Sequence, residues 1–161
     1  MSFEAVKDYF SQAGLGDRVL LLNQSSATVD QAAQALGCQP KQIAKTLSFL
    51  VEGTPILIVA AGDAKIDNRK YKERFHQKAT MIPREEVAPL VGHPPGGVCP
   101  FCVLSGVNVY LDVSLKRFDH VYPAAGSPNS AVLLNLPELE QHSKSKGWVD
   151  VCKGWEENPQ P

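Results

Sequence analysis

The segment from Gly92 to Cys102 constrains the fold of this chain more than any other stretch. It reads Gly-His-Pro-Pro-Gly-Gly-Val-Cys-Pro-Phe-Cys, with three glycines and three prolines in eleven residues. Proline lacks a backbone N–H and fixes φ, and glycine adds backbone freedom, so this composition excludes the interior of a helix or of a central strand. The segment is therefore predicted to be a shaped loop. Composition alone fits an ordinary surface turn, but paired glycines also suit a loop that brings backbone N–H groups close to a ligand.

The size and composition of the chain limit its class. Its 161 residues are enough for one domain with a sizeable core, and 43% apolar with 20% charged residues is typical of a globular protein. No apolar run approaches the roughly 20 residues of a membrane-spanning helix, and the chain begins with a polar segment rather than a signal peptide. We therefore expect a cytoplasmic protein without membrane contacts. A protein that binds long stretches of nucleic acid such as DNA needs a basic surface, and the net charge of −1 argues against this role. The charge does not argue against a protein that binds only the terminus of an RNA.

Helical spacing of apolar residues, caps and stop signals predict five main helices. One of them begins with Thr28-Val-Asp-Gln31, which has the form of a capping box, and ends at Gly37. The predicted helices cover residues 3–15, 28–36, 65–78, 83–90 and 137–146.

Short apolar or alternating runs predict the strands. They cover residues 18–23, 43–51, 56–61, 80–82, 107–113, 121–122, 131–134 and 148–151. The runs on either side of Gly53 are expected to form a hairpin. Because several strands follow one another directly, we predict an α+β fold with a mixed, bent, barrel-like sheet flanked by helices. A single domain is expected over residues 1–152, followed by a flexible tail over 153–161.

The four cysteines are too few and too scattered for a secreted disulfide framework, so free thiols are expected. They are Cys38, Cys99, Cys102 and Cys152. A redox Cys-Pro-Phe-Cys motif would open a helix soon after the first strand, and this one does not. With His93, the pair offers three zinc ligands where a closed structural site takes four. We therefore favour two loop cysteines that pack as small hydrophobic side chains, and expect no metal or cofactor.

Lys45 lies in an apolar context, between Ala44 and Leu47. Alone, such a lysine most often extends its charge to the surface, but it can also direct a cation into a pocket to hold a phosphate or a carbonyl. The most basic stretch, residues 65–78, carries six basic and two acidic side chains. No catalytic triad, nucleophile elbow or Walker loop is legible. An enzyme of this sequence would depend on positioning, backbone donors and water.

Three segments of the chain form an informative ordered set. They are Gln42-Ile-Ala-Lys-Thr-Leu-Ser-Phe49 after an Ala-Ala-Gln-Ala-Leu-Gly helix, Gly96-Gly-Val-Cys-Pro-Phe101 after Pro-Arg-Glu-Glu-Val, and Ala125-Gly-Ser-Pro-Asn129 before an apolar strand. In this order and spacing they resemble the YbaK/prolyl-tRNA synthetase-associated domain family of free-standing trans-editing aminoacyl-tRNA deacylases. The resemblance covers about residues 20 to 140.

The resemblance implies hydrolysis of the ester in a mischarged tRNA, most often tRNA-Pro carrying a small non-cognate amino acid. The implied partners are the 3′ end of an aminoacyl-tRNA and prolyl-tRNA synthetase. Catalytic roles are expected for Lys45, Gly96, Gly97 and Asn129. Substrate contacts are expected from Thr28, Val98, Cys99, Pro100, Ala125, Gly126 and Ser127. The basic segment offers Lys65, Arg69 and Lys70 as tRNA-binding residues.

In the family, the terminal ribose hydroxyl is thought to help activate water, which agrees with the lack of a triad. Ala124 and Ala131 stand where cysteine-editing members have serine and aspartate, which argues against a cysteinyl substrate. Cys102 replaces a glycine that many relatives carry. Two alternatives remain: a non-catalytic module that binds an RNA end or a synthetase, and a thiol-redox or zinc protein that uses Cys99 and Cys102.

Overall fold

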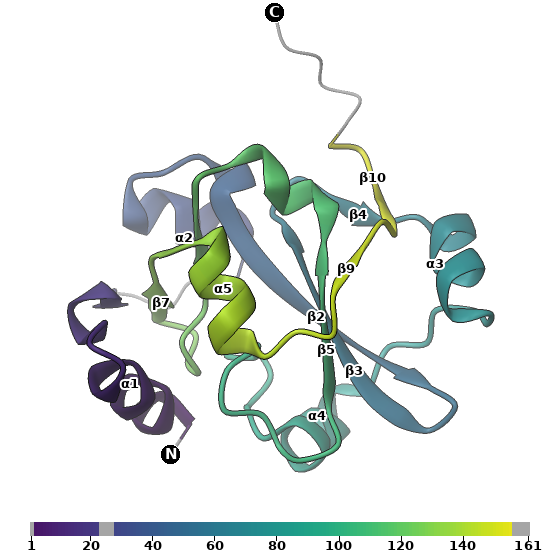
Figure 1. Cartoon of the computed structure of the whole chain (residues 1–161), viewed down its shortest axis with the longest axis horizontal. Coiled ribbons are helices and arrows are strands. Elements are labelled where there is room, and N and C mark those ends of the chain that lie inside the picture. Colours follow the sequence, from purple (N-terminus) through teal and green to yellow (C-terminus); the bar gives the residue numbers. More distant parts are fainter. Residues whose placement is uncertain (1, 23–27, 156–161) are drawn as a thin grey trace, which may run out of the picture.

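The two apolar runs around Gly53 form the central hairpin of the computed structural model, which describes residues 2–22 and 28–155 (Figure 1). Strand β2 (Ile43–Val51) pairs antiparallel with β3 (Thr54–Ala61), and Leu47 lies opposite Ile58. The turn residues Glu52 and Gly53 have φ of 50° and 82°. Positive φ at both central positions is what a tight type I′ hairpin turn requires. The predicted hairpin is therefore confirmed.

Four further strands extend the hairpin into a curled, mixed, six-stranded sheet with the order β8-β6-β2-β3-β5-β9. They are β5 (Asn108–Asp112), β6 (His120–Pro123), β8 (Leu134–Asn135) and β9 (Trp148–Val149). The pairs β2–β6, β3–β5 and β5–β9 are parallel, whereas β6–β8 is antiparallel. Two small antiparallel sheets join distant segments: β1 (Val19–Leu21) with β7 (Ser130–Val132), and β4 (Lys65–Ile66) with β10 (Cys152–Lys153). The predicted α+β fold with a bent mixed sheet is confirmed.

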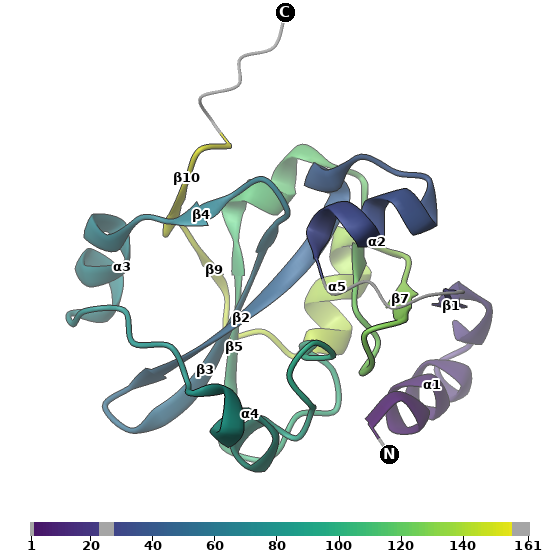
Figure 2. The same cartoon turned by 180° about the vertical axis from the view of Figure 1, so that it is seen from behind.

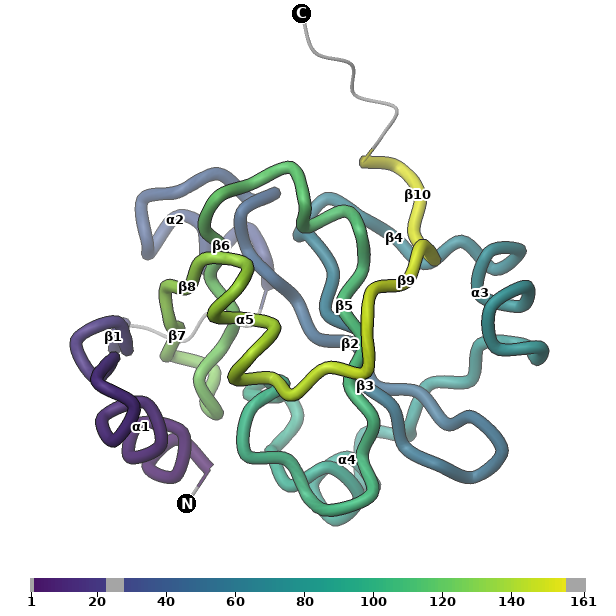
Figure 3. The backbone as a smooth tube through the Cα atoms, in the orientation of Figure 1, coloured from purple at the N-terminus to yellow at the C-terminus, as the bar shows by residue number. Residues whose placement is uncertain are grey.

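Five α-helices flank the sheet in the described part of the chain. They are α1 (Ser2–Gln12), α2 (Val29–Leu36), α3 (Asn68–Phe75), α4 (Arg84–Val91) and α5 (Leu136–Ser143). The short 3₁₀ turns are η1 (Gly16–Arg18), η2 (Pro40–Gln42) and η3 (Val113–Arg117). Helices α5 and α2 lie on opposite sides of the sheet, as the front and back views show (Figures 1 and 2). The path of the chain between these elements is followed most easily in Figure 3.

The capping box predicted at the start of α2 is present. Thr28 Oγ1 accepts a hydrogen bond from Gln31 N (3.1 Å), and Gln31 Oε1 accepts one from Thr28 N (3.3 Å). Gly37 ends the helix in the left-handed region, with φ of 73°. This local chemistry fixes where α2 begins and ends.

Several sequence predictions needed correction. The helices expected over 3–15 and 137–146 end at Gln12 and Ser143, and the strand expected over 148–151 ends at Val149. The helix expected over residues 65–78 begins only at Asn68, because the carboxylate of Asp67 accepts hydrogen bonds from the N–H groups of the first helical turn and caps the helix there. The strand expected over 80–82 is reduced to one isolated bridge between Met81 and Phe49. The strand expected over 131–134 is divided, because β7 pairs with β1 whereas β8 pairs with β6.

The first residues after position 152 are in contact with the rest of the chain. Lys153 pairs with Lys65 in the β4–β10 sheet, and Trp155 packs against the edge of the core. Residues 156–161 of the predicted tail, and Asn23 of the predicted strand 18–23, lie outside the described residues.

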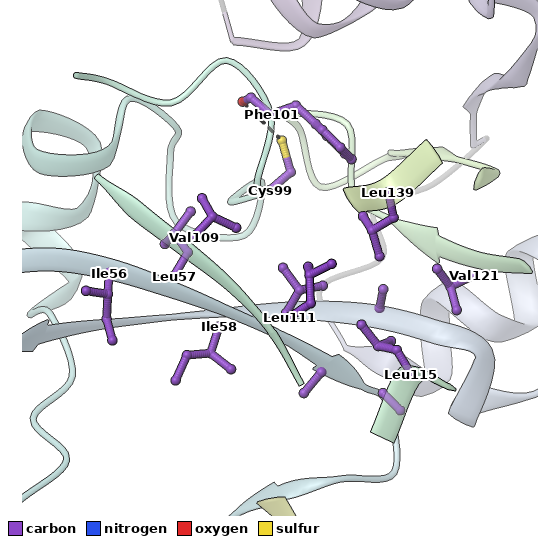
Figure 4. Packing of buried hydrophobic residues seen from close by; sticks show 14 of the residues in the cluster. Ile56, Leu57, Ile58, Cys99, Phe101, Val109, Leu111, Leu115, Val121 and Leu139 are labelled. Atoms are coloured by element: carbon purple, nitrogen blue, oxygen red, sulfur yellow. Dashed lines mark hydrogen bonds between the residues drawn. The ribbon is translucent and has the colours of Figure 1, made fainter. Parts of the chain in front are cut away.

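One layer of the core lies between the sheet and the loop around Cys99. Leu57 and Val109 are at most 2% exposed and face Cys99 and Phe101, which cover this side of the sheet (Figure 4). Ile58, one residue along β3, points to the opposite side, as the alternation of side chains along a strand demands. The loop that the sequence singled out is therefore tied to the core by its own apolar residues.

Across residues 2–22 and 28–155, every helix is too short or too polar to span a lipid bilayer.

We predict that Leu57→Ala lowers the free energy of unfolding by about 2–5 kcal/mol, because it leaves a cavity beneath the loop. Leu57 is fully buried, whereas Leu21 is 62% exposed, so Leu21→Ala is a matched control with an expected loss below about 1 kcal/mol. Urea unfolding followed by fluorescence measures both. Equal losses in the two variants would contradict this description of the core.

Candidate functional site

A pocket of about 220 Å³ opens where β2, α2 and two loops meet. Its wall includes Lys45 from the start of β2, Gly96 and Val98 from the first loop, Ser127 from the second loop, and Thr28 at the cap of α2. These are five of the residues that the sequence nominated. Segments that are distant along the chain thus converge on one concave site.

Lys45 lines this pocket, and its ammonium group is held by the backbone that follows β3. Lys45 Nζ donates hydrogen bonds to the carbonyl oxygens of Gly62 (3.4 Å) and Ala64. Partial burial lowers the pKa of Lys45 from its usual range, and the nearby charge of Asp63 opposes this effect. Two neutral carbonyls satisfy the cation only in part, so a bound phosphate or ester oxygen could compete for it.

The first loop, residues 92–102, and the second loop, residues 124–129, touch backbone to backbone. A Cβ atom on Gly97 would lie 2.8 Å from the carbonyl oxygen of Gly126 and 2.8 Å from Ser127 Cα, closer than real side chains allow. Gly97 N donates to Pro94 O (2.9 Å), so this N–H group is engaged within its own loop. The role that the structure gives to Gly97 is to permit the close approach of the two loops.

The second loop is ordered by its own hydroxyl and amide groups. Ser127 Oγ lies 2.9 Å from Asn129 Oδ1 and 2.8 Å from Ser130 Oγ, and Ser130 Oγ donates to Ser127 O (3.1 Å). Because Asn129 accepts through its amide oxygen, its amide nitrogen remains the group able to donate to a ligand. Asn129 itself does not line the pocket, although its neighbours Pro128 and Ser130 do.

A buried histidine fastens the first loop to the N-terminus of α1. His93 is 1% exposed; its Nε2 lies 2.6 Å from Phe101 O, and its Nδ1 is hydrogen-bonded to Ser2 Oγ. A carbonyl oxygen can only accept, so Nε2 carries the proton and Nδ1 accepts from the serine hydroxyl. A Cβ on Gly126 would lie 2.8 Å from Ser2 O. The start of α1 therefore contacts both loops of the site.

Several residues that line the pocket were not nominated from the sequence. Val29, Ala32 and Leu36 form the apolar side, which belongs to α2. The helical periodicity of α2 showed an apolar face but gave no sign of what that face covers. Thr46 also lines the pocket, and its hydroxyl is buried without a hydrogen-bond partner in the described chain. A buried, unsatisfied hydroxyl is a natural contact for a polar ligand group.

Four nominated substrate contacts lie outside the pocket wall. One of them, Gly126, is where the second loop meets Gly97 and Ser2. Cys99 and Ala125 are fully buried and pack in the core, so their side chains are not presented to the pocket. Pro100 lines a different cavity of about 330 Å³, next to Tyr9 and His142. The sequence placed these residues on the correct loops, but the direction of each side chain depends on packing that local sequence does not encode.

The nominated tRNA-binding residues lie at the opposite end of the sheet from α1, on β4 and α3 (Figure 1). Lys65 and Arg69 are exposed. Lys70 is engaged with the protein itself, because its ammonium group contacts Asp150 Oδ1 (3.2 Å) and Cys152 O (3.0 Å). The contact made by Lys70 holds β10 against α3.

The thiols do not match a redox pair. Burial raises the pKa of Cys99 to about 12 and also raises the pKa of Cys102, whereas a reactive thiol needs a depressed pKa. Cys99 Sγ lies 3.5 Å from His93 Nε2, but that nitrogen is engaged with Phe101 O. Within residues 2–22 and 28–155, no group of three or more His, Cys, Asp or Glu side chains is placed to hold a metal ion. Cys99 is buried and packs in the core as expected, whereas the prediction that Cys102 packs in the same way is wrong, because its side chain is exposed.

Comparison with known proteins defines the class of this chain. Residues 23–141 match the sequence model of the aminoacyl-tRNA editing domain, so the chain belongs to that family. The uncharacterized protein YwhH of Bacillus subtilis (strain 168) is 52% identical over 157 residues, which cover 97% of this chain and 100% of that protein.

Two further similarities connect the chain to prolyl-tRNA synthetases. The proline–tRNA ligase of Citrifermentans bemidjiense is 25% identical over 125 residues, which are 77% of this chain but only 22% of the ligase. A crystal structure of a protein described as a proposed trans-editing enzyme for prolyl tRNA synthetase superposes with a TM-score of 0.84 and 28% identity. That match covers 95% of this chain and 98% of the other. The resemblance seen in the sequence is thus confirmed at the level of family and fold.

We predict that protonation of His93 weakens the fold at mildly acidic pH. Burial lowers the pKa of His93 below the 6.5 of an exposed histidine, so between these values the unfolded chain binds a proton that the folded chain does not. Stability should therefore fall as the pH drops through about 6.5, with a slope of at most about 1.4 kcal/mol per unit. Urea unfolding from pH 7.5 to 5.0 measures this slope.

In His93→Gln the slope should be smaller than in the wild type, because the titrating group is gone. His120 is exposed, and His120→Gln serves as the matched control with the wild-type slope. A slope that is the same in all three proteins would contradict a buried neutral His93.

Proposed function

We propose that the chain is a trans-editing aminoacyl-tRNA deacylase that hydrolyses the ester of a mischarged tRNA, with tRNA-Pro carrying a small non-cognate amino acid as the substrate. The observation that carries this proposal is the pocket in which Lys45, the glycine loop and the Ser127 loop meet. Membership of the editing-domain family supports the reaction class. The similarity to proline–tRNA ligases supports the choice of tRNA.

The reaction needs only modest catalytic assistance, because the ester that links an amino acid to ribose is already reactive toward hydrolysis. Water adds to the acyl carbon, the bond between that carbon and the ribose oxygen breaks, and the water proton reaches the departing ribose oxygen. Charge develops on the carbonyl oxygen in the intermediate, where fixed N–H donors stabilise it. In this proposal the backbone of Gly96 and Val98 supplies donors, Asn129 supports the second loop, and the neighbouring ribose hydroxyl helps to activate the water.

Lys45 has the role of an anchor in this proposal. Its ammonium exchanges the carbonyl groups of Gly62 and Ala64 for a phosphate or ester oxygen of the 3′ end, which is a stronger, charge-assisted partner. This exchange places the ester between the cation and the first loop. Positioning of this kind can supply a large part of the rate increase without a protein nucleophile.

The apolar wall explains why the acyl group should be small. Val29, Ala32 and Leu36 close the pocket on the side of α2, and the volume of about 220 Å³ must also admit the ester and a water. Discrimination by size works best by excluding the larger, correct amino acid. Thr46, whose hydroxyl is buried and unpaired, offers the pocket one polar contact for the substrate. Lys65 and Arg69 are proposed tRNA contacts, and prolyl-tRNA synthetase is the proposed protein partner.

A deacylation panel tests the proposed function. The purified chain is incubated with tRNA-Pro charged with alanine, serine, cysteine, 2-aminobutyrate or proline, and release of the amino acid is followed over time. We expect release of at least one small amino acid and retention of proline. Binding of tRNA without release from any ester, at high protein concentration, would identify a non-catalytic RNA-end module instead.

We predict that Lys45→Met reduces kcat/KM by about 10²-fold, because it keeps the apolar stem and removes the cation that positions the ester. The midpoint of urea unfolding should fall only modestly, because the carbonyl of buried Ala64 loses one hydrogen bond whereas Gly62 is partly exposed. Lys7→Met on exposed α1 is the matched control and should retain full activity. Normal deacylation by Lys45→Met would remove Lys45 from the site.

A further inference from the structure

Two lysines face each other across the small β4–β10 sheet. The pairing register places Lys65 directly opposite Lys153, and both side chains are exposed. Like charges that stand opposite each other destabilise a strand pair. The fold therefore keeps two positive charges together at a point where one neutral or acidic residue would stabilise the sheet.

Within residues 28–155, the carboxylates near this lysine pair have other partners. Asp63 is held by Arg117 at 2.6 Å, and Asp150 pairs with Lys70 at 3.2 Å. Asp67 caps α3 through Arg69 N and Lys70 N, and Lys153 contributes to lowering its pKa. None of the ion pairs formed within the described residues includes Lys65 or Lys153. The two ammonium groups are thus available to an anion from outside.

A short run of contacts connects the lysine pair to the candidate pocket. The turn after β3 leads directly into β4, and the carbonyls of Gly62 and Ala64 in this turn hold the ammonium of Lys45. On its other side, a Cβ on Gly62 would lie 2.8 Å from the side chain of Val29, which lines the pocket. The charge of Lys65 also contributes to the lowered pKa of Lys45. Figure 2 shows β4 and β10 at the same edge of the molecule as α2.

We propose that Lys65 and Lys153 form a phosphate-binding pair for the backbone of the tRNA acceptor end whose ester lies beside Lys45. This inference rests on the proposed function and adds a binding site that includes β10, a strand outside the region matched by the family. The phosphate diester of a single strand lies between the two ammonium groups, relieves their repulsion and continues the polynucleotide away from the pocket. Such contacts fix the position of the RNA and carry no sequence information.

Salt-dependent binding tests this pair separately from catalysis. The probe is uncharged tRNA-Pro, and its Kd for the full chain is measured between 50 and 300 mM KCl. For single strands, each phosphate contact contributes about 0.7 to the slope of log Kd against log salt. Because the pair holds one phosphate, we expect Lys65→Gln combined with Lys153→Gln to reduce this slope by about 0.7 and to raise Kd about tenfold at the lowest salt.

Two matched double variants distinguish a specific phosphate site from a general effect of the protein's positive charge on tRNA binding. Replacing both lysines by arginine keeps the charges, so the wild-type slope should be retained. Lys7→Gln combined with Lys146→Gln removes the same charge from exposed positions elsewhere and should leave the slope unchanged. Thermal unfolding of every variant should stay within about 2 °C of the wild type, because surface changes of this kind alter stability little.

Kinetics with a charged tRNA complete the test. If the deacylation panel identifies a substrate, the glutamine pair should raise KM with kcat nearly unchanged, because binding remote from the ester is lost equally from the ground and transition states. The phosphate site is overturned if the variant with both glutamines keeps the wild-type salt slope. It is also overturned if the Lys7 and Lys146 control loses as much of the slope as that variant does. Either result leaves the deacylase proposal standing. Wild-type binding that depends on the pair without any deacylation would support the site and overturn the catalytic proposal.

Discussion

The contact between two glycine-containing loops is the constraint on which the candidate site depends. At Gly97 the backbone of the first loop lies so close to Gly126 that a side chain would require one loop to move. The same approach brings Gly96 and Ser127 into the wall of one pocket. Neither loop has regular secondary structure to hold it, so their position comes from anchors on either side. Phe101 and Cys99 attach the first loop to the sheet, and β7 leads the second loop back to β1.

Local signals made much of this fold predictable. The capping box at Thr28, the hairpin at Gly53 and the loop after Gly92 each depend on residues close together in sequence, and the structure contains all three. A lysine in an apolar run and two small-residue loops likewise pointed to a shared site. The structure places Lys45 with Gly96 and Ser127 in one pocket wall.

Contacts between residues that are distant in sequence could not be predicted from these local signals. The hydrogen bond between Ser2 and His93 joins residues 91 positions apart, and the strand pair of Ile66 with Cys152 joins segments from opposite halves of the chain. Neither leaves a periodic pattern in the sequence. The same limit explains the inward direction of Cys99, since the side of a loop that faces the core is decided by what packs against it.

The N-terminal helix belongs to the site although it precedes the region matched by the family, residues 23–141. Ser2 contacts His93 in the first loop and Gly126 in the second, and Phe10 stacks edge-on against Phe101 at 4.9 Å between ring centroids. The similarity to YwhH extends over 157 residues and so includes most of this helix. The smallest unit that holds the pocket in shape is therefore larger than the editing domain as the family defines it.

The pairing of β1 with β7 also has a consequence for biosynthesis. Val19 meets Val132, and the pocket wall uses residues from Leu22 to Ala131. A polypeptide emerging from the ribosome cannot close this wall until Val132 has left the exit tunnel. An interrupted translation product would thus carry Lys45 and the glycine loop without a working cleft, and would expose apolar surface to the chaperones and proteases that remove incomplete chains.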